Sequence, residues 1–232
     1  MIENLTLIIP TKDDHESILK NLQEIYNFLD SFVTEYEILV VSNGSSDDSI
    51  SKINKFVKDS DKTKQIVLSE KGKGIAIREG INNSIYSNIV FVDADMSVKI
   101  NELKNFVKNG KLLSGFVIGS RKLENSRNLN SPILRHLSGN IYSQIVKMLF
   151  RIKLKDTQCG FKAIDRELFS DCNKFTLNNF SFDLELILLA MKANIEIKEI
   201  PVTYIHDKSS SVKILNDSFT MFKDLLFLKK RY

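Results

Sequence analysis

Short apolar runs alternate with helix-like stretches through the first half of this chain, and this alternation restricts the fold more than any other feature. Continuous apolar strands separated by helices are typical of a parallel sheet covered on both faces. We therefore predict an α/β fold with a mostly parallel central sheet sandwiched by helices. The apolar runs cover residues 5–10, 37–42, 65–69, 88–93 and 115–120, and the helix-like stretches lie near 14–31, 47–59, 73–84 and 100–109.

The second half of the chain has longer helical patterns. Residues 131–152 are predicted to form an amphipathic helix that Ser131 and Pro132 open. A helix near 183–193, a strand near 195–204 and an amphipathic helix over 217–232 follow. Since no repeat and no Pro/Gly-rich linker interrupts the sequence, we predict a single domain over residues 1–232.

Composition excludes several classes of protein. The net charge of +4 is modest and spread along the chain, so we expect no nucleic-acid partner. No apolar run approaches the ~20 residues that span a bilayer, and the first residues lack the basic region of a secretory signal. Cys159 and Cys172 form neither a CxxC pair nor a zinc set. We expect a cytoplasmic chain.

Two carboxylates, Asp93 and Asp95, directly follow the apolar run "NIVFV". Ligands of open α/β sheets bind beyond the carboxyl ends of the strands, and carboxylates there can share a divalent cation. Mg²⁺ usually takes one or two protein carboxylates and leaves its other positions to water and phosphates. A solvated turn or helix-capping acids are the alternative, but the buried strand before the pair favours a metal site.

Other segments offer contacts for phosphate. The stretch "EKGKGIAIREG" can bring backbone amides and Lys71 or Lys73 close to a phosphate, although a solvated loop explains it equally well. Arg121, Arg135 and Ser138 surround the start of the predicted helix 131–152. Arginines bind phosphate through forked hydrogen bonds, while each arginine taken alone reads as a surface charge.

The order of these pieces resembles the family 2 glycosyltransferases of the GT-A fold. The similarity is strongest to the dolichyl- or polyprenyl-phosphate hexose transferases of the β-glucosyl and mannosyl branches. It extends from "IIPTKDD" to "SSSVK" and includes "GKGIAIREG", "VDADMS", "DTQCGFK" and "FSFDLELILLA". The resemblance implies a GT-A nucleotide-diphospho-sugar transferase fold, with a nucleotide-sugar-binding half over 1–120 and an acceptor-binding half over 121–232.

The resemblance also implies roles for particular residues. Asp93 and Asp95 would hold Mg²⁺ or Mn²⁺ on the donor diphosphate, and Lys213 would assist the leaving diphosphate. Asp183 matches an acid of the family motif and is expected to anchor loops. The acceptor phosphate is assigned to Arg121, Arg135 and Ser138. The nucleotide-sugar site is assigned to Pro10, Thr11, Lys12, Asp14, Ser42, Gly44, Lys73 and Asp93.

Several positions depart from the family pattern. Many relatives have an arginine before the final Ser-x-Lys region, where this chain has Asp207 and Lys208. Ser42 stands where relatives usually carry an aspartate that contacts the base, so the identity of the base is left open. Ser97 stands where some lipid-phosphate transferases have another metal-ligating residue.

By this resemblance, the chain is expected to transfer a hexose from a nucleoside diphosphate sugar, of the UDP-glucose or GDP-mannose type, to a polyprenyl or dolichyl monophosphate. Transfer would invert the anomeric carbon. One alternative keeps the fold but uses a saccharide hydroxyl as acceptor, and then needs a general base such as Asp183 or Asp156. The other is a non-catalytic nucleotide-sugar-binding protein.

Two predicted helices, 131–152 and 217–232, each carry an apolar face, and the second ends in Lys229, Lys230 and Arg231. Such faces favour a position in the headgroup region of an anionic membrane. We therefore expect peripheral association with the cytoplasmic face of a membrane. Packing of the same faces into the core or into a homodimer is the alternative.

Overall fold

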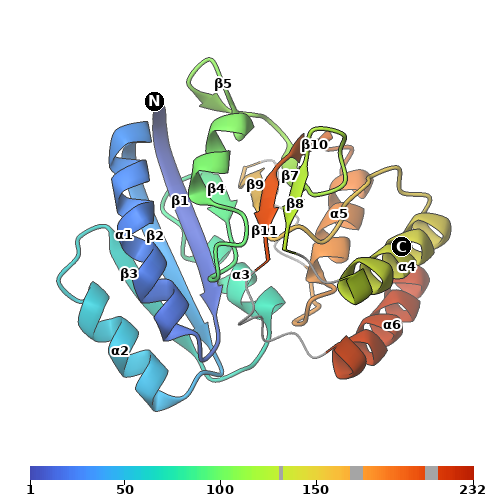
Figure 1. Cartoon of the computed structure of the whole chain (residues 1–232), viewed down its shortest axis with the longest axis horizontal. Coiled ribbons are helices and arrows are strands. Elements are labelled where there is room, and N and C mark those ends of the chain that lie inside the picture. The colour runs from blue at the N-terminus through green and yellow to red at the C-terminus, as the bar shows by residue number, and fades with distance from the viewer. Residues whose placement is uncertain (131–132, 168–174, 207–213) are drawn as a thin grey trace.

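The computed structural model describes the backbone of residues 1–130, 133–167, 175–206 and 214–232, and the side chains of all these except 133–141 and 214–219. A seven-stranded sheet with the order β10-β7-β9-β4-β1-β2-β3 runs through the molecule (Figure 1). Only β9 is antiparallel to its neighbours, so the predicted mostly parallel sheet is confirmed. The strands are β1 Ile2–Thr11, β2 Val33–Asn43, β3 Thr63–Leu68, β4 Asn88–Phe91, β7 Phe116–Ser120, β9 Lys162–Asp165 and β10 Ile197–Pro201.

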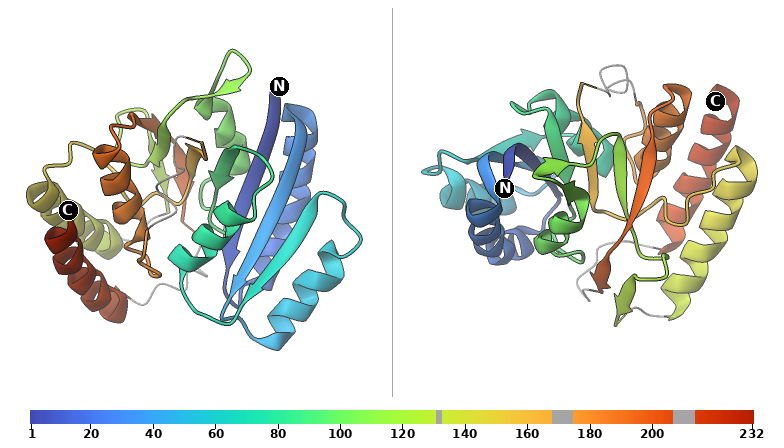
Figure 2. Two further views of the ribbon diagram at one scale, coloured as in Figure 1. Left: turned by 180° about the vertical axis from the view of Figure 1, so that it is seen from behind. Right: turned by 90° about the horizontal axis from the view of Figure 1, so that it is seen from above.

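Helices cover both faces of this sheet, as predicted (Figures 1 and 2). Helices α1 (His15–Phe32) and α2 (Asp47–Val57) lie on one face, and α3 (Lys73–Asn82) lies on the other beside α5 (Phe182–Lys192). Helices α4 (Ile133–Phe150) and α6 (Ile214–Arg231) pack together on the outer side of α5. The central strands are buried on both sides, since neighbouring residues such as Leu7 and Ile8 are both fully buried.

Two predicted elements differ in the structure. Residues 100–109 do not form an α-helix: a 3-10 helix, η1 (Ile100–Phe106), leads into the hairpin β5 (Val107–Lys108) and β6 (Lys111–Leu112). The predicted strand 195–204 is divided into β10 and β11 (Thr203–Ile205): the pairing with β7 runs to Ser120, whose carbonyl accepts from the amide of Val202 at 3.2 Å, and the chain then changes its partner. Strand β11 pairs instead with β8 (Arg127–Leu129).

None of the helices in the described part of the chain is long and apolar enough to cross a membrane.

Candidate active site

The carboxyl ends of β1 and β2 are tied together by side chains that reach between their loops. The register pairs Thr11 with Ser42, so both strands end at the same level of the sheet. Asn43 donates from Nδ2 to the carbonyl of Thr11 at 2.8 Å and accepts from the amide of Gly72 at 3.0 Å. The Asp13 carboxylate accepts from the amide of Ser46 at 2.6 Å, and this bond lowers the pKa of Asp13. These bonds tie three loops together at the carboxyl edge of the sheet.

The residues expected at the nucleotide differ in how far they are exposed at this edge. Pro10 and Thr11 are buried at the end of β1, whereas Lys12 is exposed and Asp14 half-buried. Ser42 is fully buried, and its hydroxyl accepts from Gln65 Nε2 at 2.9 Å.

Gly44 lies at the turn after β2. It has φ +56°, and a Cβ there would lie 2.3 Å from Cγ of Lys71. Both the left-handed backbone and the nearby lysine side chain favour glycine at this turn.

Asp93 and Asp95 follow β4 at the centre of the same edge. The ammonium of Lys73, at the start of α3, forms an ion pair with Oδ1 of Asp93. Burial raises the pKa of Asp93, but Lys73 outweighs it and holds that pKa below its usual value. Burial and the neighbouring Asp93 carboxylate raise the pKa of Asp95, whose Oδ1 accepts from the amide of Ser97 at 2.9 Å. The two acids thus carry different proton affinities.

The segment "DTQCGFK" reaches Asp93 from the second half of the chain. A Cβ added at Gly160 would lie 2.0 Å from Oδ2 of Asp93, so the carboxylate occupies the space that a side chain would take. Two residues later, Lys162 is fully buried on β9 and donates to Oδ1 of Asp183 at 2.7 Å. Burial raises the pKa of Asp183 in spite of this partner. Lys73, Asp93, Lys162 and Asp183 form a cluster of alternating charges.

Arg121 follows β7, and its side chain is engaged within the protein. Its Nε and Nη2 donate to the two carboxylate oxygens of Asp156 at 2.7 and 3.0 Å, and its amide donates to Asp156 at 3.0 Å. Its guanidinium carbon lies 5.4 Å from the ring centre of Tyr204. Burial raises the pKa of Asp156, but Arg121 brings it well below its usual range. The forked pair of hydrogen bonds that was predicted for a phosphate is thus formed with Asp156. Nη1 of Arg121 makes no hydrogen bond among the described residues.

The other residues expected at the acceptor fall where the structure gives no side chains. Arg135 and Ser138 lie on the first turns of α4, of which the backbone alone is described. Lys213 lies outside the described residues.

Comparison with known proteins identifies the family. The model for glycosyl transferase family 2 matches residues 6–172. The chain belongs to this family. Among curated relatives, a dolichyl-phosphate beta-glucosyltransferase of Trichomonas vaginalis is 30% identical over 90% of this chain and 66% of its own length. The human dolichyl-phosphate beta-glucosyltransferase is 29% identical over 99% of this chain and 76% of its own length. The chain thus spans about two thirds to three quarters of these relatives.

Solved structures support the GT-A fold. Glucosyl-3-phosphoglycerate synthase from Mycobacterium tuberculosis, in complex with Mn²⁺, UDP and phosphoglyceric acid, matches with a TM-score of 0.68 and 13% identity, over 97% of this chain and 76% of that one. A mannosyltransferase from Pyrobaculum calidifontis in complex with GDP-Man and Mn²⁺ matches with a TM-score of 0.57 and 15% identity. The match covers 90% of this chain and 59% of that one. At these identities the likeness concerns the fold.

The residues at this family 2 site are suited to a divalent cation. Asp93 and Asp95 offer carboxylates at one strand end, and a cation bound to Oδ1 of Asp93 would take the place of the Lys73 ammonium there. Ser97 Oγ, two residues after Asp95, is buried without a hydrogen-bond partner among the described atoms. The described residues include no group of three or more His, Cys, Asp or Glu that would hold a metal. Two carboxylates with phosphate and water suffice for Mg²⁺.

Sequence reasoning missed the roles of Asn43, Gly160 and Lys162. The motif that contains the last two was recognised, but nothing in it indicates that Gly160 abuts a carboxylate 67 positions away. Asn43 follows an apolar strand within a turn-forming stretch, and that signal is common to many loops.

Proposed function

We propose that this family 2 glycosyltransferase moves a hexose from a nucleoside diphosphate sugar to a polyprenyl monophosphate, with inversion at the anomeric carbon. The observation that carries the proposal is the carboxylate pair at the end of β4, in which Asp93 is paired with Lys73 and lies against Gly160. The names of the curated relatives, dolichyl-phosphate beta-glucosyltransferases, support a lipid phosphate as acceptor and glucose as the sugar. Neighbours solved with UDP and with GDP-Man agree with a nucleotide-sugar donor.

The state of the acids supports a phosphate acceptor over a hydroxyl acceptor. A phosphate monoester has a second pKa near ~6, so at neutral pH it is a dianion that attacks without help from a protein base. A hydroxyl acceptor needs a general base. The two candidates are both engaged: Asp156 is held ionised by Arg121, and Asp183 is buried against Lys162. Positioning and charge neutralisation would then carry the catalysis.

Asp93 and Asp95 would hold Mg²⁺ or Mn²⁺, and Lys73 would lie beside the donor diphosphate. The cation, when bound, would neutralise charge that develops on the departing diphosphate. The chain itself would contribute three things to this step. Gly160 leaves room for the Asp93 carboxylate, Lys73 adds positive charge, and the loops held by Asn43 close around the nucleotide.

Association with the cytoplasmic face of a membrane belongs to the same proposal, and exposed apolar residues of α6 support it. Phe222, Leu226 and Phe227 are each about half exposed, at 50%, 51% and 47%. Lys230 is exposed beside them. The other two basic residues at this end are partly engaged, since Lys229 donates to the carbonyl of Leu149 and Arg231 pairs with Glu185.

The test is a donor and acceptor screen with purified protein, Mg²⁺ or Mn²⁺ and a short polyprenyl phosphate. We expect transfer from a UDP- or GDP-hexose to the lipid phosphate, with the β-linked product required by inversion of an α-linked donor. Asp93→Asn and Asp95→Asn should remove most turnover and metal-dependent donor binding while the fold is retained. Transfer to saccharide hydroxyls but not to the lipid phosphate would contradict the acceptor. Unchanged metal-dependent donor affinity in both variants would contradict the metal site.

A further inference from the structure

The segment 175–178, "FTLN", lies against the start of α3. The amide of Gly74 donates to the carbonyl of Asn178 at 2.8 Å. A Cβ at Gly72 would lie 2.1 Å from that carbonyl oxygen, and a Cβ at Gly74 would lie 2.2 Å from another carbonyl oxygen of the segment. The two glycines thus allow the two backbones to approach closely, and Lys73 is the residue between them.

Side chains hold the same segment beside Lys73. Arg78, further along α3, donates from Nη1 to the carbonyl of Phe175 at 3.1 Å and from Nη2 to Oδ1 of Asn178 at 2.9 Å. The ring of Phe175 lies 6.0 Å from that of Phe182, at the start of α5. The Lys73 ammonium lies 5.9 Å from the ring centre of Phe182. The segment and the start of α5 therefore border both the backbone and the side chain of Lys73.

One buried carboxylate, that of Glu185 on α5, holds the segment from its other side. Its Oε2 accepts from the amides of Thr176 and Leu177, both at 2.8 Å. Its Oε1 accepts from the hydroxyl of Thr176 at 3.2 Å and from Nη1 of Arg231 at 3.1 Å. Glu185 is fully buried, and all four of these partners are donors. The site is therefore made for an ionised carboxylate, which only accepts.

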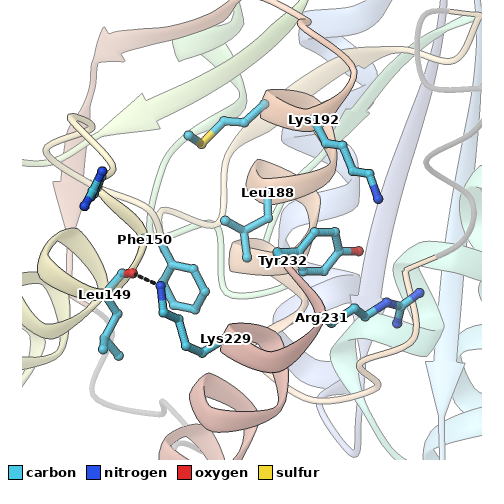
Figure 3. A pocket seen from close by; sticks show the side chains of 9 residues that line it. Leu149, Phe150, Leu188, Lys192, Lys229, Arg231 and Tyr232 are labelled. Carbon is cyan, nitrogen blue, oxygen red and sulfur yellow. Dashed lines mark hydrogen bonds between the residues drawn. The ribbon is translucent and has the colours of Figure 1, made fainter.

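Arg231 connects this carboxylate to the last turn of α6. It donates to the hydroxyl of Thr176 at 2.7 Å as well as to Glu185. Figure 3 shows its side chain directed away from Lys229, which donates to the carbonyl of Leu149. The guanidinium supplies the partner charge without which a buried carboxylate would be costly.

We propose that Glu185 is a positioning residue for the sugar donor. By holding the segment 175–178 in place, it fixes the start of α3, and with it Lys73, beside the donor diphosphate. Its part in donor binding rests on the proposed function, in which Lys73 lies next to that diphosphate. A fixed position matters there, because a charge stabilises the departing group best when it needs no reorganisation. Glu185 itself does not touch the donor and acts through Lys73.

The substitution Glu185→Gln tests this role with little change of volume. A glutamine side chain presents one oxygen and one NH2 group. In either orientation, the NH2 group would face donors that now point at a carboxylate oxygen, so the segment must shift. We expect the affinity for UDP-glucose or GDP-mannose with Mn²⁺, whichever the wild type binds, to fall at least about tenfold in calorimetry, as for other supports of a metal site. The KM for the lipid phosphate should stay that of the wild type.

The matched control is Glu37→Gln, the same change at a buried carboxylate on β2. Oε1 of Glu37 accepts from the hydroxyl of Thr6 at 2.7 Å and from the amide of Ile85 at 2.6 Å. Its Oε2 has no hydrogen-bond partner among the described atoms. The oxygen of a glutamine can keep both bonds there, and the residue lies five positions before the strand end at Ser42. Donor affinity should therefore equal that of the wild type.

Two further variants test the route by which Glu185 acts. In a double-mutant cycle with Lys73→Met, Glu185→Gln should add little to the loss of donor affinity, because residues that act through one another are not additive. Gly74→Ala would press on the segment from the α3 side, since its Cβ would meet a carbonyl oxygen of the segment. It should weaken donor binding in the same way, and it decides the question if Glu185→Gln does not fold.

Urea unfolding of each variant establishes that it is folded under the conditions of the assay. Wild-type donor affinity in folded Glu185→Gln, equal losses in the Glu37→Gln control, or additive losses in the cycle would overturn the positioning role and leave the transferase proposal intact. Glu185 would then serve stability alone. A wild type that binds neither nucleotide sugar would overturn the proposed function, and the role of Glu185 in donor binding with it.

Discussion

At the scale of single residues, Gly160 gives the Asp93 carboxylate the space it occupies. A Cβ there would lie 2.0 Å from one carboxylate oxygen and 2.7 Å from the other, so Gly160→Ala must displace Asp93. We expect metal-dependent donor affinity, measured by calorimetry with Mn²⁺ and UDP-glucose, to fall by about 10–100-fold, the usual effect of disturbing the support of a metal ligand. The free energy of unfolding should fall by about 1–3 kcal/mol, the usual cost of overpacking.

The control for this substitution is Gly110→Ala in the β5–β6 turn, where φ is +74° and Asp93 is not in contact. It should strain the backbone and leave donor affinity unchanged. Wild-type affinity in Gly160→Ala would show that Asp93 has room to move without loss of the site.

Asp156 gives a prediction about pH. Its pKa is lowered in the folded protein by Arg121, so the stabilisation is complete above the unfolded pKa of about 3.9 and is lost as the pH falls through the folded value. Asp156→Asn should lower the free energy of unfolding by about 3 kcal/mol at neutral pH, the lower end for a broken buried pair, because Arg121 is 27% exposed. Urea unfolding between about pH 5 and pH 1 should show this difference shrinking. A difference that is constant with pH would mean that Asp156 contributes through its shape and not its charge.

Residues differ in how far their place was predictable from sequence. Asp93 and Asp95 were predictable because an apolar strand precedes them and strand ends form sites. The partner of Arg121 was not, since Asp156 is 35 positions away and carries no local signal. Lys162 was the hardest of these, because lysine is almost never fully buried unless it is paired, and its partner Asp183 lies on another element.

At the scale of elements, the amphipathic α6 divides its apolar residues between core and surface. Leu225 and Leu228 are buried, so for them the packing alternative is correct, whereas Phe222 and Leu226 are about half exposed. We expect Phe222→Ser/Leu226→Ser to weaken flotation with anionic vesicles, because apolar burial in the headgroup region is lost. Its effect on unfolding should stay within about 0.5 kcal/mol per substitution, as is usual at exposed sites.

A matched pair of exposed apolar residues, Phe56 and Ile85, lies in the first half of the chain. The double variant Phe56→Ser/Ile85→Ser should float like the wild type. Equal flotation of both double variants would leave α6 as a packing element without a membrane role.

The elements that sequence patterns did not predict are short. Strand β9 has four residues, "KAID", of which one is a buried lysine and one an aspartate, so neither alternation nor an apolar run marks it. The helix expected near residue 100 became the 3-10 turn η1, because its segment must lead directly into the β5–β6 hairpin. Longer elements such as β1 and α1 were predictable since their periodicity continues over several turns or residues.

At the scale of the whole molecule, the sheet joins the two halves of the chain at the site. Strand β9, from the second half, lies between β4 and β7 of the first half. This places Lys162 opposite Phe91, two residues before Asp93, and within reach of Asp183 on α5. The charges at the site therefore come from four separate segments, and the Lys162–Asp183 pair is the buried link between β9 and α5.

This link can be measured with a double-mutant cycle. Lys162→Met removes the ion-pair partner of the buried Asp183, and Asp183→Leu removes that of the buried Lys162. Each substitution should lower the free energy of unfolding by about 3–5 kcal/mol. The double variant should regain most of that loss, because no unpaired charge remains. The surface pair Lys99–Glu24, at 2.9 Å with side chains 37% and 50% exposed, is the control and should show a coupling below about 1 kcal/mol. Additive losses at Lys162 and Asp183 would mean that the two side chains stabilise the fold independently, and that the charge pair does not hold β9 to α5.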